Sequence, residues 1–303
     1  MVPPEDFGFN EETAGDNAWQ NRLNDSPAEI RAKAMQEFEN FTQTLREHGV
    51  AVLCLEKESD ERPPLPDAVF PNNWFSTSVD GTVVIYTAAT PNRRAERRPL
   101  DLERLVLANG FDIRSYVYIG RIEESVRVLE GTGSMVFDHL HRVSYAARSE
   151  RTHPAAFREF VRLRGHTEGV LFDASDSRGQ PIYHTNVMMS IGTHFAVVCS
   201  DCIVPTHRDY VVERLADTRE VLSITVEQME KGFCGNILEL QSQDGEPLIA
   251  MSSRAHEAFG EEGRAFLSRF GTLVHSDLST IEAVGGGSAR CMLAEIFLPQ
   301  ARA

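Results

Sequence analysis

The first strong hydrophobic pattern of the chain predicts an amphipathic helix. Its apolar residues repeat on one face of a 3.6-residue period, at Ile30, Met35, Phe38, Phe41 and Leu45. Ser26, Pro27 and Glu29 match the N-cap, the first helical position and the capping-box residue. Gly49 is typical of a helix end. The apolar run 50–55 that follows predicts a short buried strand.

Apolar segments of helix length alternate with shorter apolar segments over the rest of the chain. The helix-sized segments lie near residues 99–108, 153–163, 206–216 and 254–269. The strand-sized segments lie at residues 83–86, 143–145, 196–199 and 248–251. This alternation predicts a mixed α/β protein without a long linker or a low-complexity tract.

A polar residue recurs at a near-constant spacing, mostly inside short strand-like segments. The positions are Asn17, Asn73, Glu130, His184, Asn236 and Cys291, and neighbours in this series lie 52 to 57 residues apart. Such a period predicts repeated supersecondary units that each present one polar group. Five such units account for nearly the whole chain, and a ring of them would bring the polar residues to one axis.

Cys291 has the strongest chemical signature of these residues. It follows three glycines, Gly285 to Gly287, which allow a tight turn and a close approach to a ligand. The adjacent Arg290 favours the thiolate, which is the nucleophilic form of cysteine. The apolar segment 292–298 predicts that the thiol is carried on a buried scaffold. The alternative is a small core cysteine beside a glycine turn.

Cys291, His184 and Glu130 supply the nucleophile, the base and the orienting carboxylate of thiol catalysis. Polar groups such as Glu130, Asn72 and Asn73 are costly inside apolar runs unless they bind something. Each also has a purely structural interpretation. His184 could be a hydrogen-bonded core histidine, Glu130 a surface carboxylate at a strand end, and the asparagine pair a turn.

Two other motifs carry weaker signals. Cys199 and Cys202 have the C-x-x-C spacing of zinc or redox sites, with His207 nearby. A structural zinc site needs four ligands, and the sequence has no second C-x-x-C, so we expect no metal. The basic run that contains Arg93, Arg94, Arg97 and Arg98 predicts a solvated loop.

Composition narrows the possible partners. The 303 residues carry a formal net charge of −15, which argues against nucleic acid or an anionic membrane as a partner. Residues 1–6 lack the apolar core of a signal peptide, and the five cysteines are few and scattered. We therefore expect a cytoplasmic protein that acts on a small molecule. The sequence leaves the oligomeric state open, a homo-oligomer included.

These motifs together resemble the guanidino-group-modifying superfamily, the penteins, which includes amidinotransferases and arginine deiminases. The resemblance is greatest to the branch of citrulline-utilisation hydrolases. It covers nearly the full chain and rests on residues 7–17, 66–77, 129–135, 183–186, 233–236 and 285–299. Ser78 and Ala147 depart from that branch, in which a His and a Cys are common at these places.

The resemblance implies a fold, a domain organisation and a set of catalytic roles. The fold is a five-unit α/β propeller with pseudo-fivefold symmetry, and residues 1–303 form a single catalytic domain. Cys291 is implied as the nucleophile and His184 as the general acid and base. Glu130 is implied as a carboxylate near His184 or near the terminal nitrogens of the substrate. No metal or organic cofactor is implied.

Two asparagines favour an uncharged substrate. Arginine deiminase relatives hold the guanidinium cation with carboxylates, whereas Asn73 and Asn186 stand at the corresponding places here. A guanidinium offers only donors, but a ureido group has a carbonyl acceptor as well, and asparagine matches both. Further substrate-binding candidates are Asn72, Asn17 and Asp16, and candidates for binding the α-amino and α-carboxylate groups are Arg290, Arg127 and Asp16.

The sequence therefore predicts a cysteine-dependent hydrolase that acts on the ureido carbon of citrulline. The products would be ornithine, ammonia and carbon dioxide, formed through a covalent adduct on Cys291. The alternative within the same chemistry is arginine deimination or amidino transfer. An alternative of another class is a non-enzymatic protein that binds a metal or a partner through Cys199 and Cys202.

Overall fold

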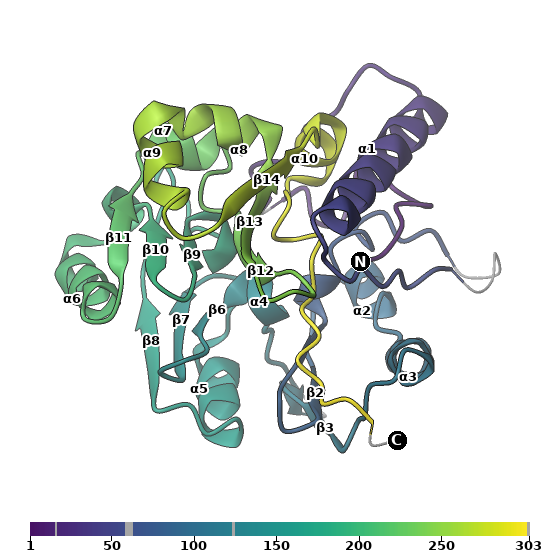
Figure 1. Cartoon of the computed structure of the whole chain (residues 1–303), viewed down its shortest axis with the longest axis horizontal. Coiled ribbons are helices and arrows are strands. Elements are labelled where there is room, and N and C mark those ends of the chain that lie inside the picture. The colour runs from purple at the N-terminus through teal and green to yellow at the C-terminus, as the bar shows by residue number, and fades with distance from the viewer. Residues whose placement is uncertain (16, 58–62, 123–124, 302–303) are drawn as a thin grey trace.

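Four three-stranded sheets with one common design dominate the fold. A computed structural model describes the chain except for residues 16, 58–62, 123–124 and 302–303 (Figure 1). In each sheet the first strand along the chain runs antiparallel to the second, and the third runs parallel to the second. The parallel crossover passes through a helix, as parallel pairing requires. The strands are short, of three to six residues.

The first two units contain these elements in chain order. The first has η1 (Pro71–Asn73), β1 (Phe75–Thr77), β2 (Thr82–Ile85), α2 (Pro91–Ala95), α3 (Pro99–Ala108) and β3 (Ser115–Tyr118). A small hairpin of β4 (Arg121–Ile122) and β5 (Ser125–Val126) follows. The second unit has α4 (Gly131–Ser134), β6 (Val136–Asp138), β7 (Val143–Ala147), α5 (Pro154–Leu163) and β8 (Glu168–Phe172).

The next two units repeat the design. The third has η2 (Thr185–Val187), β9 (Met189–Ile191), β10 (Phe195–Val198), η3 (Ser200–Cys202), α6 (Pro205–Ala216) and β11 (Glu220–Ser223). The fourth has α7 (Val226–Glu230), β12 (Leu238–Gln241), β13 (Pro247–Ser252), α8 (Ser253–Ala258), α9 (Gly260–Leu267) and β14 (Thr272–Ser276).

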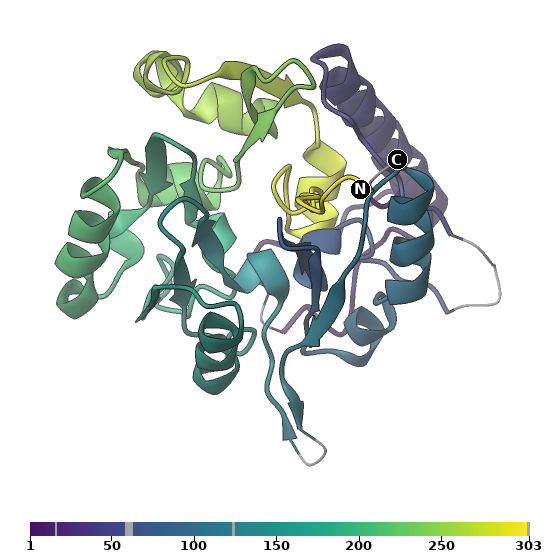
Figure 2. The same ribbon diagram turned by 60° about the horizontal axis from the view of Figure 1, so that its bottom comes forward.

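Both ends of the chain complete the ring. They contribute α1 (Pro27–Glu47), α10 (Ser279–Gly285) and the segment 286–300. In Figure 2 the four units and α1 lie around this C-terminal segment, drawn in yellow, with most helices on the outer side. The predicted capping box of α1 is confirmed, and its apolar stripe packs into one core with β14 and α10. Cys291 belongs to the same core.

Two predicted elements differ in the structure. Segment 50–55 is not part of a sheet. Leu53 O and Leu55 N bond to Met1, and Val50 N donates to Leu45 O at the end of α1, instead of to a neighbouring strand. A single residue cannot form a ladder, and Ala51 is exposed. The helix predicted over 254–269 is two helices, α8 and α9. Gly260 adopts a φ of 65°, a left-handed conformation that glycine reaches without strain and that breaks the helix there.

The segments predicted as strand-like are helical turns that precede the strands. η1, α4 and η2 each lie directly before the first strand of a unit, and residues 233–235 and 289–292 form turns. The recurring polar residues lie in or beside these turns. The turns therefore carry the buried polar side chains, and the strands that follow supply the apolar core. Among the described residues, no helix is long and apolar enough to cross a membrane.

Candidate active site

A glutamate, a histidine and an arginine from the second and third units form a buried hydrogen-bonded group. Glu130 is the N-cap of α4 and His184 is the N-cap of η2. With Nε2 protonated, His184 donates to Glu130 Oε2 at 2.8 Å, and Arg151 Nη1 donates to the same oxygen at 3.0 Å. The other carboxylate oxygen, Oε1, accepts from the backbone N–H of Ala89 at 2.8 Å.

This arrangement fixes the protonation of both groups. Burial alone would raise the pKa of Glu130, but the Arg151 guanidinium and the hydrogen bond from His184 lower it well below its ordinary value. Burial lowers the pKa of His184, against the opposing effect of Glu130. At neutral pH the site therefore holds an ionised Glu130 and a neutral His184 imidazole whose Nδ1 carries a lone pair.

Two glycines explain why α4 can approach the neighbouring units so closely. Gly131 adopts a φ of 46°, and a side chain on it would collide with the carbonyl oxygen of Asn72. A Cβ on Gly133 would collide with the Asn73 amide and would lie 2.9 Å from the His184 ring. The Gly-x-Gly that follows Glu130 is thus needed for contact among three units.

Cys291 lies on the helical turn 288–292, and two asparagine amides contact its sulfur. Its backbone N–H donates to Ser288 O at 2.9 Å. Asn186 Nδ2 donates to Sγ at 3.4 Å and Asn236 Nδ2 donates to Sγ at 3.2 Å. The thiol is 3% exposed. His184 is two residues before Asn186 at the start of η2, so one turn carries a sulfur contact and the candidate base.

The other asparagines predicted to bind substrate, Asn72, Asn73 and Asn17, hydrogen-bond to groups other than the sulfur of Cys291. With its amide oriented to satisfy both ends, Asn73 donates to Asn72 Oδ1 at 3.2 Å and accepts from both terminal nitrogens of Arg93, at 3.0 and 3.1 Å. Asn17 binds the glycine turn: Nδ2 donates to Gly285 O at 3.1 Å and Oδ1 accepts from the backbone of Trp19. Asp16 lies outside the described residues.

Three buried polar atoms beside these residues lack a hydrogen-bond partner within the described part of the chain. They are Asn186 Oδ1, Asn72 Nδ2 and Asp67 Oδ1. Unsatisfied buried polar atoms are uncommon, because each costs about 1–3 kcal/mol. Asn186, which contacts the sulfur of Cys291, therefore keeps an open acceptor, and Asn72 and Asp67 keep an open donor and an open acceptor.

The structure corrects one prediction and adds three residues. Arg93 was predicted in a solvated loop, but it is 4% exposed and donates to both carboxylate oxygens of Glu96 at 2.9 to 3.1 Å. Arg151 is buried against Glu130, and Asp67 accepts from Asn10 at 2.6 Å. Burial raises the pKa of Asp67 despite the nearby Arg93. Asp67 had a visible signal, a carboxylate in an apolar run, but the arginines had none.

Arg290 and Arg127 were candidates for binding the substrate's amino-acid end. Arg290 donates to Leu293 O at 2.9 Å, lies 3.6 Å from Glu295 and lines a cavity of about 800 Å³. The first strands of the units and the C-terminal segment form this cavity, and Cys291, His184 and Glu130 do not line it. Arg127 is half-buried, and its carbonyl oxygen accepts from Thr87.

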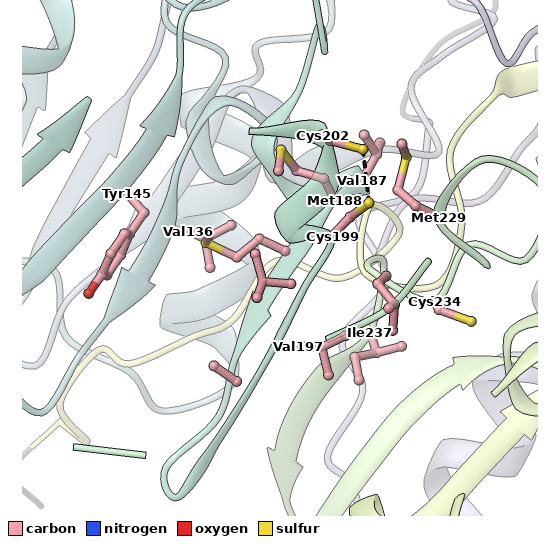
Figure 3. Packing of buried hydrophobic residues seen from close by; sticks show 14 of the residues in the cluster. Val136, Tyr145, Val187, Met188, Val197, Cys199, Cys202, Met229, Cys234 and Ile237 are labelled. Atoms are coloured by element: carbon pink, nitrogen blue, oxygen red, sulfur yellow. Dashed lines mark hydrogen bonds between the residues drawn. The ribbon is translucent and has the colours of Figure 1, made fainter. Parts of the chain in front are cut away.

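The C-x-x-C pair lies in the hydrophobic core of the third unit. Figure 3 shows Cys199 and Cys202 side by side among Val187, Met188 and Met229, and their sulfurs are 2.8 Å apart. Their possible third ligand, His207, instead accepts from the backbone of Asp173 through Nδ1. Over the described residues, no group of three or more His, Cys, Asp or Glu side chains could hold a metal.

The repeated units and a central cysteine, histidine and carboxylate define a pentein enzyme that modifies guanidino-type groups. A family profile described as "N,N dimethylarginine dimethylhydrolase, eukaryotic" matches residues 3–298, and the chain belongs to this family. The predicted superfamily and its α/β pentein fold are thereby confirmed, whereas the closer likeness to citrulline hydrolases is not. No curated protein sequence matches the chain.

Several solved structures share the fold of this chain. The N-terminal domain of ArgZ, an arginine dihydrolase of cyanobacteria, was solved bound to substrate. It is 17% identical, with a TM-score of 0.69 over 98% of both chains. Full-length ArgZ has a TM-score of 0.72 at 18% identity, and the match covers 100% of this chain but 42% of ArgZ. A dimethylarginine dimethylaminohydrolase adduct has a TM-score of 0.60 at 15% identity, over 86% of this chain and 90% of that one.

Proposed function

We propose that this enzyme hydrolyses the ureido group of citrulline to ornithine, ammonia and carbon dioxide. Its family membership supports cysteine-dependent hydrolysis of a guanidino-type C–N bond, and the finer choice of citrulline rests on the polar groups near the sulfur. Those groups are neutral amides. Asn186 offers an open acceptor, Oδ1, and Asn72 offers an open donor, Nδ2. One donor and one acceptor match a ureido group, which has both N–H and C=O.

A guanidinium cation fits these groups less well. It has no acceptor for an amide N–H, and it is best compensated by carboxylates that are free to pair with it. The carboxylate nearest to His184 is Glu130, which already accepts from Arg151, His184 and Ala89. A bound guanidinium would therefore find little negative charge to pair with. The free-energy cost of burying its charge is one that a neutral ureido group does not have.

In the proposed reaction the neutral His184 imidazole takes the thiol proton of Cys291 at Nδ1, and the resulting thiolate attacks the ureido carbon. The tetrahedral intermediate collapses to a covalent Cys291 adduct as one C–N bond breaks, and the departing nitrogen takes its proton from the catalytic imidazole of His184. The same imidazole then removes a proton from water, which attacks the adduct and releases the thiolate. Loss of carbon dioxide from the resulting carbamate balances the reaction. Glu130 holds the imidazole and stabilises its protonated form.

The amino-acid end of the substrate would bind near the buried charges. Arg93 and Arg151 are two buried guanidinium groups close to Asn73 and Glu130, and Asp67 keeps one oxygen without a partner. An α-carboxylate is a suitable ligand for a guanidinium, and an α-ammonium for a carboxylate. We assign these roles to the three residues in place of Arg290 and Arg127. The roles of Asn17 and Asp16 remain predictions.

Arginine is the second candidate substrate. Glu130 stays ionised, and a guanidinium that displaced one of its three partners would find a negatively charged acceptor there. ArgZ, an arginine dihydrolase, also shares the fold. Arginine would undergo the same attack by Cys291, because both substrates present a carbon bound to three heteroatoms, but loss of ammonia would leave an amidino adduct in place of the carbonyl adduct formed from citrulline.

Product analysis tests the proposal. The purified protein is incubated separately with citrulline, arginine and N,N-dimethylarginine, and ornithine, citrulline and ammonia are quantified. We expect ornithine and one equivalent of ammonia from citrulline. Citrulline accumulating from arginine, with no ornithine from citrulline, would overturn the substrate assignment and leave the cysteine chemistry intact.

A further inference from the structure

Asn236 lies on a turn that is pressed against the neighbouring unit. The turn spans residues 233–237, between α7 and β12, and Asn236 N donates to Phe233 O at 2.8 Å. Phe233 has a φ of 53°, which is uncommon for a residue other than glycine. A side chain on Gly235 would collide with the backbone of Val187. The turn is thus fixed against η2, which carries Asn186.

The Asn236 amide links this turn to both the nucleophile and η2. Its Nδ2 donates to Cys291 Sγ at 3.2 Å and to Asn186 O at 3.0 Å. Its Oδ1 accepts from the backbone N–H of Cys291 at 3.4 Å. The side chain is fully buried, so water does not compete for these contacts. Of the residues contacting Cys291, Asn236 alone holds both its backbone and its sulfur within the described structure.

These contacts determine which end of the amide faces the sulfur. Asn186 O can only accept and the Cys291 N–H can only donate, so Nδ2 faces Asn186 O and with it Sγ, whereas Oδ1 faces the Cys291 N–H. The sulfur then accepts from two amide donors, Asn236 and Asn186. Donors stabilise a charged acceptor more than a neutral one, so this pair favours the thiolate. A hydrophobic residue or a carboxylate at position 236 would not do the same.

We propose that Asn236 is a positioning residue that fixes the Cys291 side chain and stabilises its thiolate. This inference rests on the proposed role of Cys291 as the nucleophile. The competing explanation is that Asn236 only clamps turn 233–237 to segment 288–292. A clamp would change the stability of the fold but not the acid–base behaviour of the thiol.

Alkylation of the substrate-free protein separates the two explanations. Wild type and Asn236→Asp are treated with iodoacetamide over a range of pH, and the modification of each cysteine is followed by peptide mass spectrometry. Asn236→Asp keeps the shape of the side chain but replaces the donor with an acceptor. We expect the midpoint of the Cys291 alkylation profile to move to higher pH, and its rate at neutral pH to fall about tenfold or more.

Two controls are built into the experiment. Cys54, which is half-buried and distant in sequence, reports on general reagent access in the same sample. Asn40→Asp introduces the same charge on the exposed face of α1 and should leave the Cys291 profile unchanged. If Asn236→Asp does not fold, Asn236→Ala removes the donor without adding charge, and a shift in the same direction is expected.

An unchanged Cys291 profile in a folded Asn236 variant would overturn the inference. So would a wild-type Cys291 that reacts no faster at neutral pH than Cys54. Alkylation needs no substrate, so its outcome is independent of the substrate assay. A shifted profile without turnover of citrulline or arginine would support Asn236 and reject the proposed function. Turnover with an unchanged alkylation profile would support the proposed function and reject the proposed role of Asn236.

Discussion

Two groups of buried polar residues meet at Asn73, and they differ in charge. One is made of neutral amides from Asn72, Asn186 and Asn236, of which two contact the sulfur and two keep an open hydrogen-bonding atom. The other is charged and contains Arg93 paired with Glu96, and Arg151 paired with Glu130. Asn73 connects them, because it contacts Asn72 on one side and Arg93 on the other.

The difference indicates which end of a substrate each group suits. The amides can match a neutral group that both donates and accepts, whereas the arginines and Asp67 suit the charged groups of an amino acid. Each arginine is already paired with a carboxylate, so neither guanidinium is an uncompensated buried charge before a substrate binds. The predictions below change one group at a time.

Removal of the sulfur should have the largest effect. Cys291→Ala should lower turnover by roughly four orders of magnitude or more, because no covalent adduct can form. Ornithine release from citrulline is the measurement. Cys54→Ala, outside both groups, should retain full activity. A Cys291→Ala protein that keeps even a tenth of wild-type turnover would contradict the assigned nucleophile.

Neutralising the carboxylate in the charged group should have the next largest effect. Glu130→Gln should lower kcat by about 10²–10⁴-fold, because the protonated His184 loses its counter-charge. It should also lower the free energy of unfolding by about 3–5 kcal/mol, because Arg151 stays buried without its carboxylate. Urea unfolding and steady-state kinetics measure the two effects.

The exposed pair of Glu227 and Lys231 provides the control for that experiment. Glu227→Gln breaks a surface ion pair on α7 and should change stability by less than about 1 kcal/mol. Glu130→Gln behaving like Glu227→Gln in both measurements would show that the buried group matters to neither catalysis nor folding.

Adding a carboxylate where the two groups meet should change substrate preference. Asn73→Asp places a negative charge beside Arg93, which compensates it in the folded protein. The ratio of kcat/KM for citrulline over arginine should fall about tenfold, because a carboxylate pairs with a guanidinium better than an amide does. An unchanged ratio would mean that Asn73 does not contact the reacting end of the substrate.

The pH profile should show the smallest effect. Burial lowers the pKa of His184, so its imidazole stays neutral until the pH falls below the ordinary histidine value of 6.5. The acid limb of kcat/KM should therefore lie below pH 6.5, with activity lost as the base becomes protonated. A limb above pH 6.5 would mean that Glu130 outweighs burial in the free enzyme.

Local and periodic signals in the sequence predicted most of the fold. The capping box of α1 is a contiguous motif. The spacing between successive polar residues from Asn73 to Cys291 matches the length of one unit. Both signals can therefore be recognised in the sequence alone. The strand predicted over residues 50–55 was wrong, because an apolar run shows a propensity for strand but does not show whether a second strand is available to pair with it. The helix predicted over residues 254–269 is divided at Gly260. Glycine permits a left-handed conformation, but whether it adopts one depends on tertiary packing.

The candidate site was predictable only where a residue type was unusual for its surroundings. His184 and Glu130 interrupt apolar segments, and the structure brings them into contact. Arg93 and Arg151 are surrounded by other polar residues in the sequence, so nothing there indicates that folding buries them. Their burial depends on Glu96 and Glu130, and the pairing of Arg151 with Glu130 spans 21 residues.

A competition experiment with wild-type protein tests the central claim most directly. Equal concentrations of citrulline and arginine are supplied in one reaction, and the initial consumption of each is measured, which gives the ratio of their kcat/KM values. We expect citrulline to be consumed at least about tenfold faster than arginine, with ornithine as the product. Faster consumption of arginine would contradict it.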